Sequence, residues 1–294
     1  MRNTGNTLAA LWLATAALLS GVPLQAAGQA NDDSKGVIAG PYVPTPWPIV
    51  DEFLKMADIG KDDMVYDLGS GDGRLVITAA KRYGARGVGI EIQPQLVELA
   101  NKQAKEAGVA DRVSFRAADL FKADYRDASV ITLYLLPRFV PLLVPKFRAE
   151  LKPGTRIVSH DYALTPWPPD KVLTFDVPEK EMISGTTRTV LYYYVVPARL
   201  GGRWDISLPK SLIAAPFSIS VTQDAEVLTG MAQIGTEMHP LRDFVVNGAT
   251  VRFSLLAQGR LMHFNGKAGE RDISGTMELQ SGGREIWSAR RSAP

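Results

Sequence analysis

The chain contains no cysteine, few histidines and no excess of either charge. Without cysteine it can form neither disulfides nor thiolate metal sites. The three histidines, His160, His239 and His263, do not have the spacing of metal ligands, so no metal site is predicted. The 33 Lys and Arg residues nearly balance the 31 Asp and Glu residues, and no basic run occurs. Nucleic acid is therefore not an expected partner.

The apolar run near the N-terminus is also too short for a membrane-spanning helix. It covers residues 8–19, whereas a spanning helix needs about 20 apolar residues. Arg2 precedes the run and small residues follow it around Ala26, which predicts a secretory signal peptide over residues 1–27 and a polar linker over 28–40. Export to the periplasm or envelope is expected. The alternative is an uncleaved N-terminal helix that anchors the protein to a membrane.

The most informative stretch is residues 65–73, which read VYDLGSGDG. An apolar strand runs into a loop with glycines at alternate positions, where the backbone can approach a ligand closely. A helix follows from Arg74, and its N-terminus offers free N–H groups to a polar ligand. Residues 89–92 form a second strand that presents Glu91, whose carboxylate can accept hydrogen bonds from ribose hydroxyls. These features predict a nucleoside-type cofactor site at the start of an α/β sheet.

The charges in this loop indicate which cofactor it binds. The dinucleotide fingerprint requires a glycine at position 74, and Arg74 stands there. Asp67 and Asp72 would repel a pyrophosphate and attract a cationic ligand, such as a sulfonium that also carries an ammonium group.

Residues 41–197 resemble the class I methyltransferases that use S-adenosyl-L-methionine (SAM), on the pattern DLGSGDG followed by an acid on the next strand. The resemblance implies that the glycine loop holds the methionine end of SAM and that Glu91 holds the ribose. It also implies that Asp119, in the loop after the third strand, binds the adenine amino group while Leu120 packs on the ring. The residues implied to bind the cofactor are Asp67, Gly69, Ser70, Gly71, Gly73, Glu91, Asp119 and Leu120.

Residues 41–48 read PYVPTPWP, and four prolines in eight positions predict a stiff, extended segment. Pro48 suits the first turn of a helix that continues to residue 58. The string PYVPTP is similar to the segment before the SAM motif in the FAM173-type lysine methyltransferases, which are related to the Dot1 histone methyltransferases. That resemblance implies that Tyr42 and Thr45 close over SAM or the target amine. A rigid linker is the alternative interpretation.

Residues 130–137, VITLYLLP, are almost continuously apolar, as expected for a strand buried on both faces. The Asn-Pro-Pro-Tyr motif of adenine-N6 and glutamine methyltransferases is absent, and Tyr134 begins the YLLP that replaces it. An apolar, aromatic mouth suits an aliphatic amine, so Tyr134 is a candidate catalytic residue; core filling is its alternative role. His160 and Asp161 adjoin at the end of the next strand and should point to opposite faces. No dedicated general base is therefore predicted.

Beyond Gly201 the helical periodicity disappears and short alternating segments are separated by turn sequences, including Asn247-Gly248 and Asn265-Gly266. This pattern is typical of an antiparallel barrel or sandwich. The last strand, 286–290, is predicted to pair with 204–208. Such a module could serve dimerisation, envelope or membrane association, or substrate docking.

The predicted fold class is α/β, with a Rossmann-like class I methyltransferase sheet over residues 41–198 and an antiparallel β-rich domain over 201–294. The predicted function is SAM-dependent methylation, with a protein lysine as the acceptor. Two alternatives stay open at this point. One is a SAM-dependent methyltransferase of small molecules, and the other is an exported, non-catalytic binding protein on a methyltransferase fold.

Overall fold

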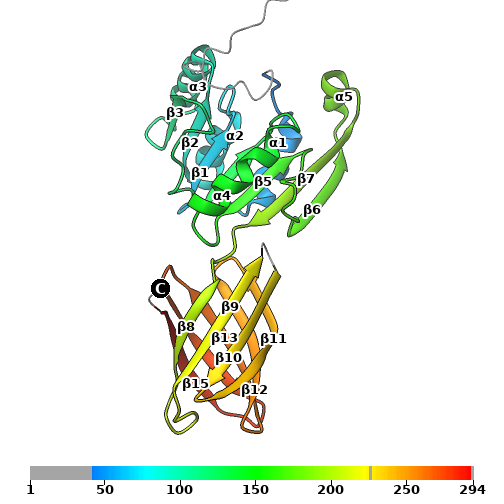
Figure 1. Ribbon diagram of the computed structural model, residues 1–294. Coiled ribbons are helices and arrows are strands. Elements are labelled where there is room, and N and C mark those ends of the chain that lie inside the picture. Colours follow the sequence, from blue (N-terminus) through cyan, green and yellow to red (C-terminus); the bar gives the residue numbers. More distant parts are fainter. Residues whose placement is uncertain (1–41, 225–226, 293–294) are drawn as a thin grey trace, which may run out of the picture. The chain divides into compact units, whose positions relative to one another are not determined.

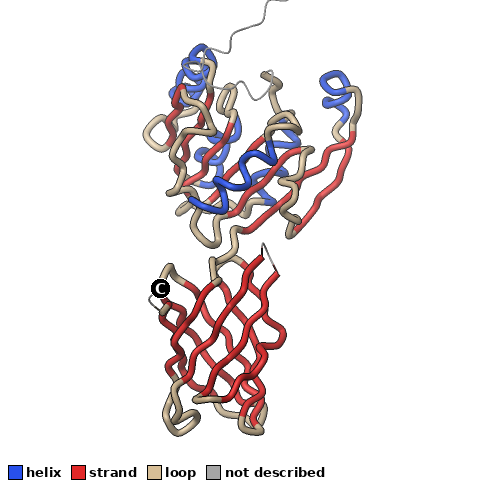
Figure 2. The backbone as a smooth tube through the Cα atoms, viewed as in Figure 1, coloured by secondary structure: helices blue, strands red, loops and turns tan. Residues whose placement is uncertain are grey.

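The computed structural model describes residues 42–224 and 227–292. The predicted signal peptide, the linker and Pro41 lie outside the described residues. A mixed sheet with helices precedes a closed barrel in the chain, and each is described separately. Figure 2 shows the change from helices and strands to strands alone.

The sheet has seven strands in the order β3-β2-β1-β4-β5-β7-β6 (Figure 1). The first five strands of this order are parallel to one another, whereas β7 runs antiparallel to both β5 and β6. The strands are β1 Met64–Leu68, β2 Arg86–Glu91, β3 Val113–Ala117, β4 Val130–Leu133, β5 Arg156–His160, β6 Lys171–Asp176 and β7 Arg188–Val195.

Helices cover both faces of the sheet because successive strand residues point to opposite sides. Val65 of β1 packs with α1 and α2, whereas its neighbour Tyr66 packs in the cluster that contains Phe147 of α4. A further cluster joins α2 and α3 to β3. The helices are α1 Trp47–Met56, α2 Arg74–Tyr83, α3 Pro94–Glu106, the 3₁₀ helix η1 Val140–Leu143, α4 Val144–Glu150 and α5 Pro178–Ser184.

The predicted strand over residues 130–137 is shorter than expected, because β4 ends at Leu133. Residues 134–136 form the loop that follows it at the carboxyl edge of the sheet. The short helix α5, between β6 and β7, was not predicted. Its sequence contains only seven helical residues, which is too few for a clear apolar period.

The C-terminal part is a closed barrel of eight antiparallel strands, each paired with its neighbour in the chain, and β15 closes on β8. Phe253 and Phe264 stack in its interior with ring centroids 4.5 Å apart, and the buried Trp287 meets both rings edge-on. The strands are β8 Gly202–Ser207, β9 Phe217–Asp224, β10 Val227–Ile234, β11 Glu237–Asn247, β12 Thr250–Ala257, β13 Arg260–Ala268, β14 Asp272–Leu279 and β15 Arg284–Arg291.

Each strand predicted beyond Gly201 falls on a strand of the barrel, and the predicted pairing of the last strand with the first is confirmed by Ala289 opposite Ile206. The turn predicted at Asn265-Gly266 is wrong, because both residues lie inside β13 and Gly266 pairs with Gly275 of β14. Strands β10 and β11 were not predicted. Gly230 and Pro240 interrupt their alternation, and both residue types are depleted in strands.

The predicted fold class, an α/β methyltransferase sheet followed by an antiparallel β domain, is confirmed by this topology. The domain boundaries at residues 198 and 201 stay predictions. Within residues 42–224 and 227–292, no helix has the length and apolar character that a membrane crossing requires.

Candidate active site

A cavity lies at the carboxyl edge of the sheet, where β1 to β5 all end. Ala118 and Leu120, after β3, line one part of it, and we call this part the β3 end. Residues 134–136, after β4, and Tyr162, after β5, line another part, which we call the β4–β5 end. The strand order places the glycine loop after β1 and Glu91 of β2 between these ends. A ligand that spans the cavity therefore meets the loops in the order of the strands.

The glycine loop owes its shape to residues with positive φ. Gly69 and Gly71 have φ of +83° and +53°, values that L-residues with side chains rarely adopt. A Cβ on Gly71 would lie 2.6 Å from the ring of Tyr42, so glycine permits that ring to cover the loop. Gly73 is not among the residues that line the cavity. A Cβ there would lie 2.5 Å from the Phe115 ring, so Gly73 allows helix α2 to pack closely on β3.

Glu91 is a buried residue of the cavity lining and is held by two backbone N–H groups. The N–H of Gly71 donates to its Oε2 and the N–H of Gln93 donates to its Oε1, and both hydrogen bonds are 3.0 Å long. Ser70 donates its own N–H to the carbonyl of Ile90, so the loop and the end of β2 are tied together. The Glu91 carboxylate is thereby fixed where the cofactor ribose is expected.

Asp67 is the buried acid at the end of β1. Its Oδ1 accepts a hydrogen bond of 2.7 Å from the hydroxyl of Thr132. Burial, with the nearby charges of Glu91 and Asp72, raises the pKa of Asp67 to about 7. This carboxyl group is therefore easily protonated in the free protein, and a cation in the cavity would favour its ionised form.

Arg74 joins the glycine loop to the segment that precedes α1. Its guanidinium donates hydrogen bonds to the Asp72 carboxylate through Nε and Nη2. It also donates a hydrogen bond of 2.7 Å to the carbonyl of Thr45, and its carbon lies 5.1 Å from the centre of the Trp47 ring. Burial alone would raise the pKa of Asp72, but the hydrogen bonds and charge of Arg74 outweigh it and lower the pKa. The predicted lid residues Tyr42 and Thr45 both line the cavity.

The β4–β5 end is aromatic and apolar. Tyr134 lies over His160, with ring centroids 4.0 Å apart and an interplanar angle of 38°. His160 is completely buried, and within the described residues neither of its ring nitrogens has a hydrogen-bond partner. Its Nε2 nevertheless lies 3.5 Å from Oδ1 of Asp161, so the prediction that these side chains point to opposite faces is wrong, because Asp161 has left the strand with a φ of +60°. Burial lowers the pKa of His160 to about 4, so the imidazole is neutral near pH 7. Burial also raises the pKa of the Tyr134 hydroxyl to about 12, so it stays protonated.

Asp119 is not among the residues that line the cavity, although its neighbour Leu120 is. Its Oδ1 accepts a hydrogen bond of 2.8 Å from the N–H of Phe121, as in an ordinary turn. The adenine-binding role of Asp119 stays a prediction. Leu135 and Leu136, which belong to the predicted apolar mouth, line the cavity, and so does Tyr162. The place of Tyr162 at the end of β5 predicted a ligand-binding edge, but this residue had no assigned role.

Known proteins match the part of the chain that builds this site. The model of the ANTKMT methyltransferase domain matches residues 67–171. A protein-lysine N-methyltransferase of Saccharolobus islandicus is 39% identical over 157 residues, which cover 53% of this chain and 93% of that protein. The chain therefore belongs to the ANTKMT-type methyltransferase family. The resemblance to the FAM173-type enzymes, the enzyme class and the cofactor SAM are thereby confirmed.

Other similar proteins are covered to different extents. The adenine nucleotide translocase lysine N-methyltransferase of Mus musculus is 37% identical over 146 residues, which cover 47% of this chain and 63% of that protein. The chain thus spans less than two thirds of this mouse relative. A crystal structure of an RNA methyltransferase from Salinibacter ruber with S-adenosyl-L-homocysteine is 51% identical, covers 54% of this chain and 96% of its own, and has a TM-score of 0.48.

The cavity of the methyltransferase also fits SAM by its own chemistry. Among the described lining residues, the charged side chains are the carboxylates of Asp67, Asp72 and Glu91 and the guanidinium of Arg74, which is already paired with Asp72. This excess of negative charge suits the sulfonium and ammonium groups of SAM. The roles of the individual residues toward SAM stay predictions.

Proposed function

We propose that this methyltransferase transfers methyl groups to lysine side chains of a protein substrate. The observation that carries the proposal is the composition of the β4–β5 end, where the described lining residues are Tyr134, Leu135, Leu136 and Tyr162, none of which carries an ionised side chain. The names of the relatives from Saccharolobus islandicus and Mus musculus, which are lysine N-methyltransferases, support the same acceptor.

An aliphatic amine must lose its proton before it can attack a methyl group. For a lysine with a pKa near 10.4, deprotonation near pH 7.4 costs about 4 kcal/mol. An apolar, aromatic environment disfavours the charged ammonium and lowers this cost. Because burial lowers the pKa of His160 to about 4, which makes it a weak base, and Tyr134 stays protonated, we propose that desolvation, rather than a dedicated base, prepares the amine.

The remaining residues hold and orient the cofactor. SAM supplies a methyl group on a sulfonium, and transfer joins that carbon to the amine nitrogen while the carbon–sulfur bond breaks with its electron pair going to sulfur. We assign Asp67 and the glycine loop to the methionine end, and Glu91 to the ribose. Leu120 at the β3 end would pack on the adenine, and Tyr42 and Thr45 would exclude water above the transferred methyl group.

We also propose that the protein is exported, on the evidence of the N-terminal sequence. SAM is made in the cytosol, so an exported enzyme needs a separate supply of its cofactor. Sequencing the mature N-terminus tests this proposal: cleavage near Ala26 supports export, and an intact Met1 on a membrane-bound protein supports the anchored alternative, with access to cytosolic SAM.

The acceptor proposal is tested with SAM that carries a tritiated methyl group. The purified protein is incubated with an extract of cells that lack its gene, and the label is followed into protein, RNA and small molecules. Glu91→Ala serves as the control that removes the ribose contact. We expect label in protein and its recovery as methyl-lysine after acid hydrolysis. Label confined to RNA or to small molecules would show that the acceptor is not lysine.

A further inference from the structure

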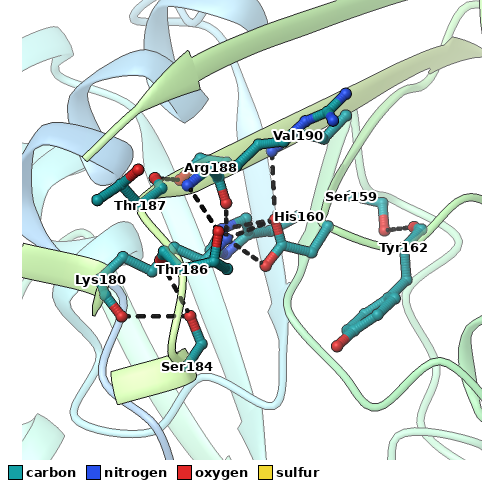
Figure 3. A network of polar contacts seen from close by, with 11 residues as sticks. Ser159, His160, Tyr162, Lys180, Ser184, Thr186, Thr187, Arg188 and Val190 are labelled. Atoms are coloured by element: carbon teal, nitrogen blue, oxygen red, sulfur yellow. Dashed lines mark hydrogen bonds and ion pairs between the residues drawn. The ribbon is translucent and has the colours of Figure 1, made fainter. Parts of the chain in front are cut away.

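An ion pair between a buried lysine and a partly buried aspartate lies next to the β4–β5 end of the cavity. Lys180 of α5, labelled in Figure 3, is only 2% exposed. Its Nζ lies 2.6 Å and 2.8 Å from the two carboxylate oxygens of Asp161. The same ammonium donates to the carbonyl of Arg188. Lys180 thus connects α5 and the start of β7 to the residue that follows β5. Neither member of the pair lines the cavity.

Asp161 occupies a turn that needs outside support. Its φ is +60°, in the left-handed region that is unfavourable for a residue with a Cβ. Its N–H donates a hydrogen bond of 2.7 Å to the carbonyl of Val190, and its carboxylate accepts a hydrogen bond of 3.2 Å from the N–H of Val190. The ion pair with Lys180 adds a second anchor, so this turn is fixed from both β7 and α5.

The neighbours of Asp161 on either side are aromatic residues of the cavity wall or its support. The ring of His160, which precedes Asp161, packs against the ring of Tyr134. Tyr162, which follows Asp161, lines the cavity. The N–H of Tyr162 donates a hydrogen bond of 2.8 Å to the carbonyl of His160. The carbonyl of Tyr162 accepts a hydrogen bond of 2.5 Å from the Ser159 hydroxyl. A movement of Asp161 would therefore reach both Tyr134 and Tyr162.

An ion pair at a largely buried position is weak evidence for a role in stability, because its replacement by apolar side chains of similar volume is often neutral or stabilising. The location of the pair suggests what it does. We propose that the Lys180–Asp161 ion pair is a positioning device that holds Tyr134 and Tyr162 against the methyl acceptor. The proposal rests on the acceptor lying at the β4–β5 end, as in the proposed function, but not on that acceptor being lysine.

Two cofactor analogues can report on this end without any acceptor. S-adenosyl-L-homocysteine carries nothing in place of the transferred methyl group. Sinefungin carries an amine there, which must lie toward Tyr134 and Tyr162. The ratio of their dissociation constants, measured by calorimetry, therefore reports the geometry of the acceptor side separately from that of the cofactor site.

The variant to test is the double substitution Lys180→Met with Asp161→Asn, which leaves no unpaired buried charge. The matched control is Lys146→Met, which breaks another partly buried ion pair, to Glu150 at 2.7 Å on α4. We expect the double variant to weaken sinefungin at least about threefold more than it weakens S-adenosyl-L-homocysteine, whereas the control leaves the ratio unchanged.

A shift of the ratio below about threefold, with both analogues weakened in parallel or neither changed, would overturn the positioning role. If the double variant does not fold, Lys180→Arg keeps the charge but displaces Asp161 with a longer side chain, and the same threshold applies. A shifted ratio in a protein that methylates no lysine would leave this inference standing and refute the proposed function alone.

Discussion

Replacing Asp67 by Asn should stabilise the free protein at neutral and alkaline pH while weakening SAM binding. Burial, together with the charges of Glu91 and Asp72, raises the pKa of Asp67 from 3.8 to about 7. A difference of about three pKa units corresponds to about 4 kcal/mol of folding free energy. The amide can still accept the hydrogen bond from Thr132, so the change removes mainly the buried charge.

The sign of the pH dependence follows from proton binding. Between about pH 4 and 7, the folded protein holds a proton on Asp67 that the unfolded chain releases. The contribution of this group to the free energy of unfolding is therefore largest below about pH 4 and is lost as the pH rises to about 7. Asn does not titrate. The stabilisation by Asp67→Asn should be absent near pH 4 and approach about 4 kcal/mol near pH 8.

Binding of SAM should show the reverse dependence. A cationic ligand favours the ionised carboxylate, so binding releases a proton below about pH 7. The affinity of the native protein for SAM should rise with pH and become constant above about pH 7. The affinity of the Asn variant should be weaker and nearly independent of pH. Calorimetry in buffers of different ionisation enthalpy measures both the affinity and the released proton.

Denaturant unfolding near pH 4 and pH 8 completes the experiment, with Asp63→Asn as the control of opposite sign. Burial alone would raise the pKa of Asp63, but hydrogen bonds from Ser129, Gly60 and Arg156 lower it. Asp63→Asn should therefore destabilise the protein near pH 8. The reasoning about Asp67 would be refuted if its Asn variant were also destabilised there, or if SAM affinity did not change with pH.

Three other substitutions test separate residues that line the cavity or lie beside it. Glu91→Ala should weaken SAM binding by about 1.5–3 kcal/mol, the loss expected for hydrogen bonds to a charged group, and calorimetry that found NAD bound in preference to SAM would contradict this site. Arg74→Lys should weaken SAM binding about tenfold, because Lys cannot bind the Asp72 carboxylate and the Thr45 carbonyl in the same geometry. Unchanged affinity would mean that these two contacts of Arg74 are not needed to hold Tyr42 and Thr45 over the cavity. His160→Phe should retain turnover within about twofold and keep the same pH–rate profile, because burial lowers the pKa of His160 to about 4 and so makes the imidazole too weak a base to deprotonate an ammonium; loss of the rise in rate on the acid side would identify His160 as a base.

The features that could be predicted from sequence are those in which neighbouring residues determine the structure. The alternate glycines that begin at Gly69, the acid Glu91 after an apolar strand, and the absence of a glycine at Arg74 all lie within a short stretch. Their chemistry predicts the cofactor site and the sheet without knowledge of distant contacts. The pairing of β8 with β15 was also predictable, because a closed barrel must join its first and last strands.

What sequence reasoning missed depends on contacts between distant residues. The hydrogen bond from Arg74 to the Thr45 carbonyl spans 29 positions, and the ion pair between Lys180 and Asp161 spans 19. No local sequence pattern predicts either of these two contacts. Asp119 shows the opposite case: its place after β3 matched the expected order, yet its carboxylate holds the N–H of Phe121 and is absent from the cavity lining.

The central claim, methylation of protein lysine, is tested most directly in cells of the source organism. Lysine methylation across the proteome is measured by mass spectrometry in cells with the native gene, without it, and with Glu91→Ala in its place. We expect methylation at specific lysines to be present with the native gene and to disappear in both other strains. Unchanged lysine methylation, together with the loss of a methylated RNA or small molecule, would contradict the account.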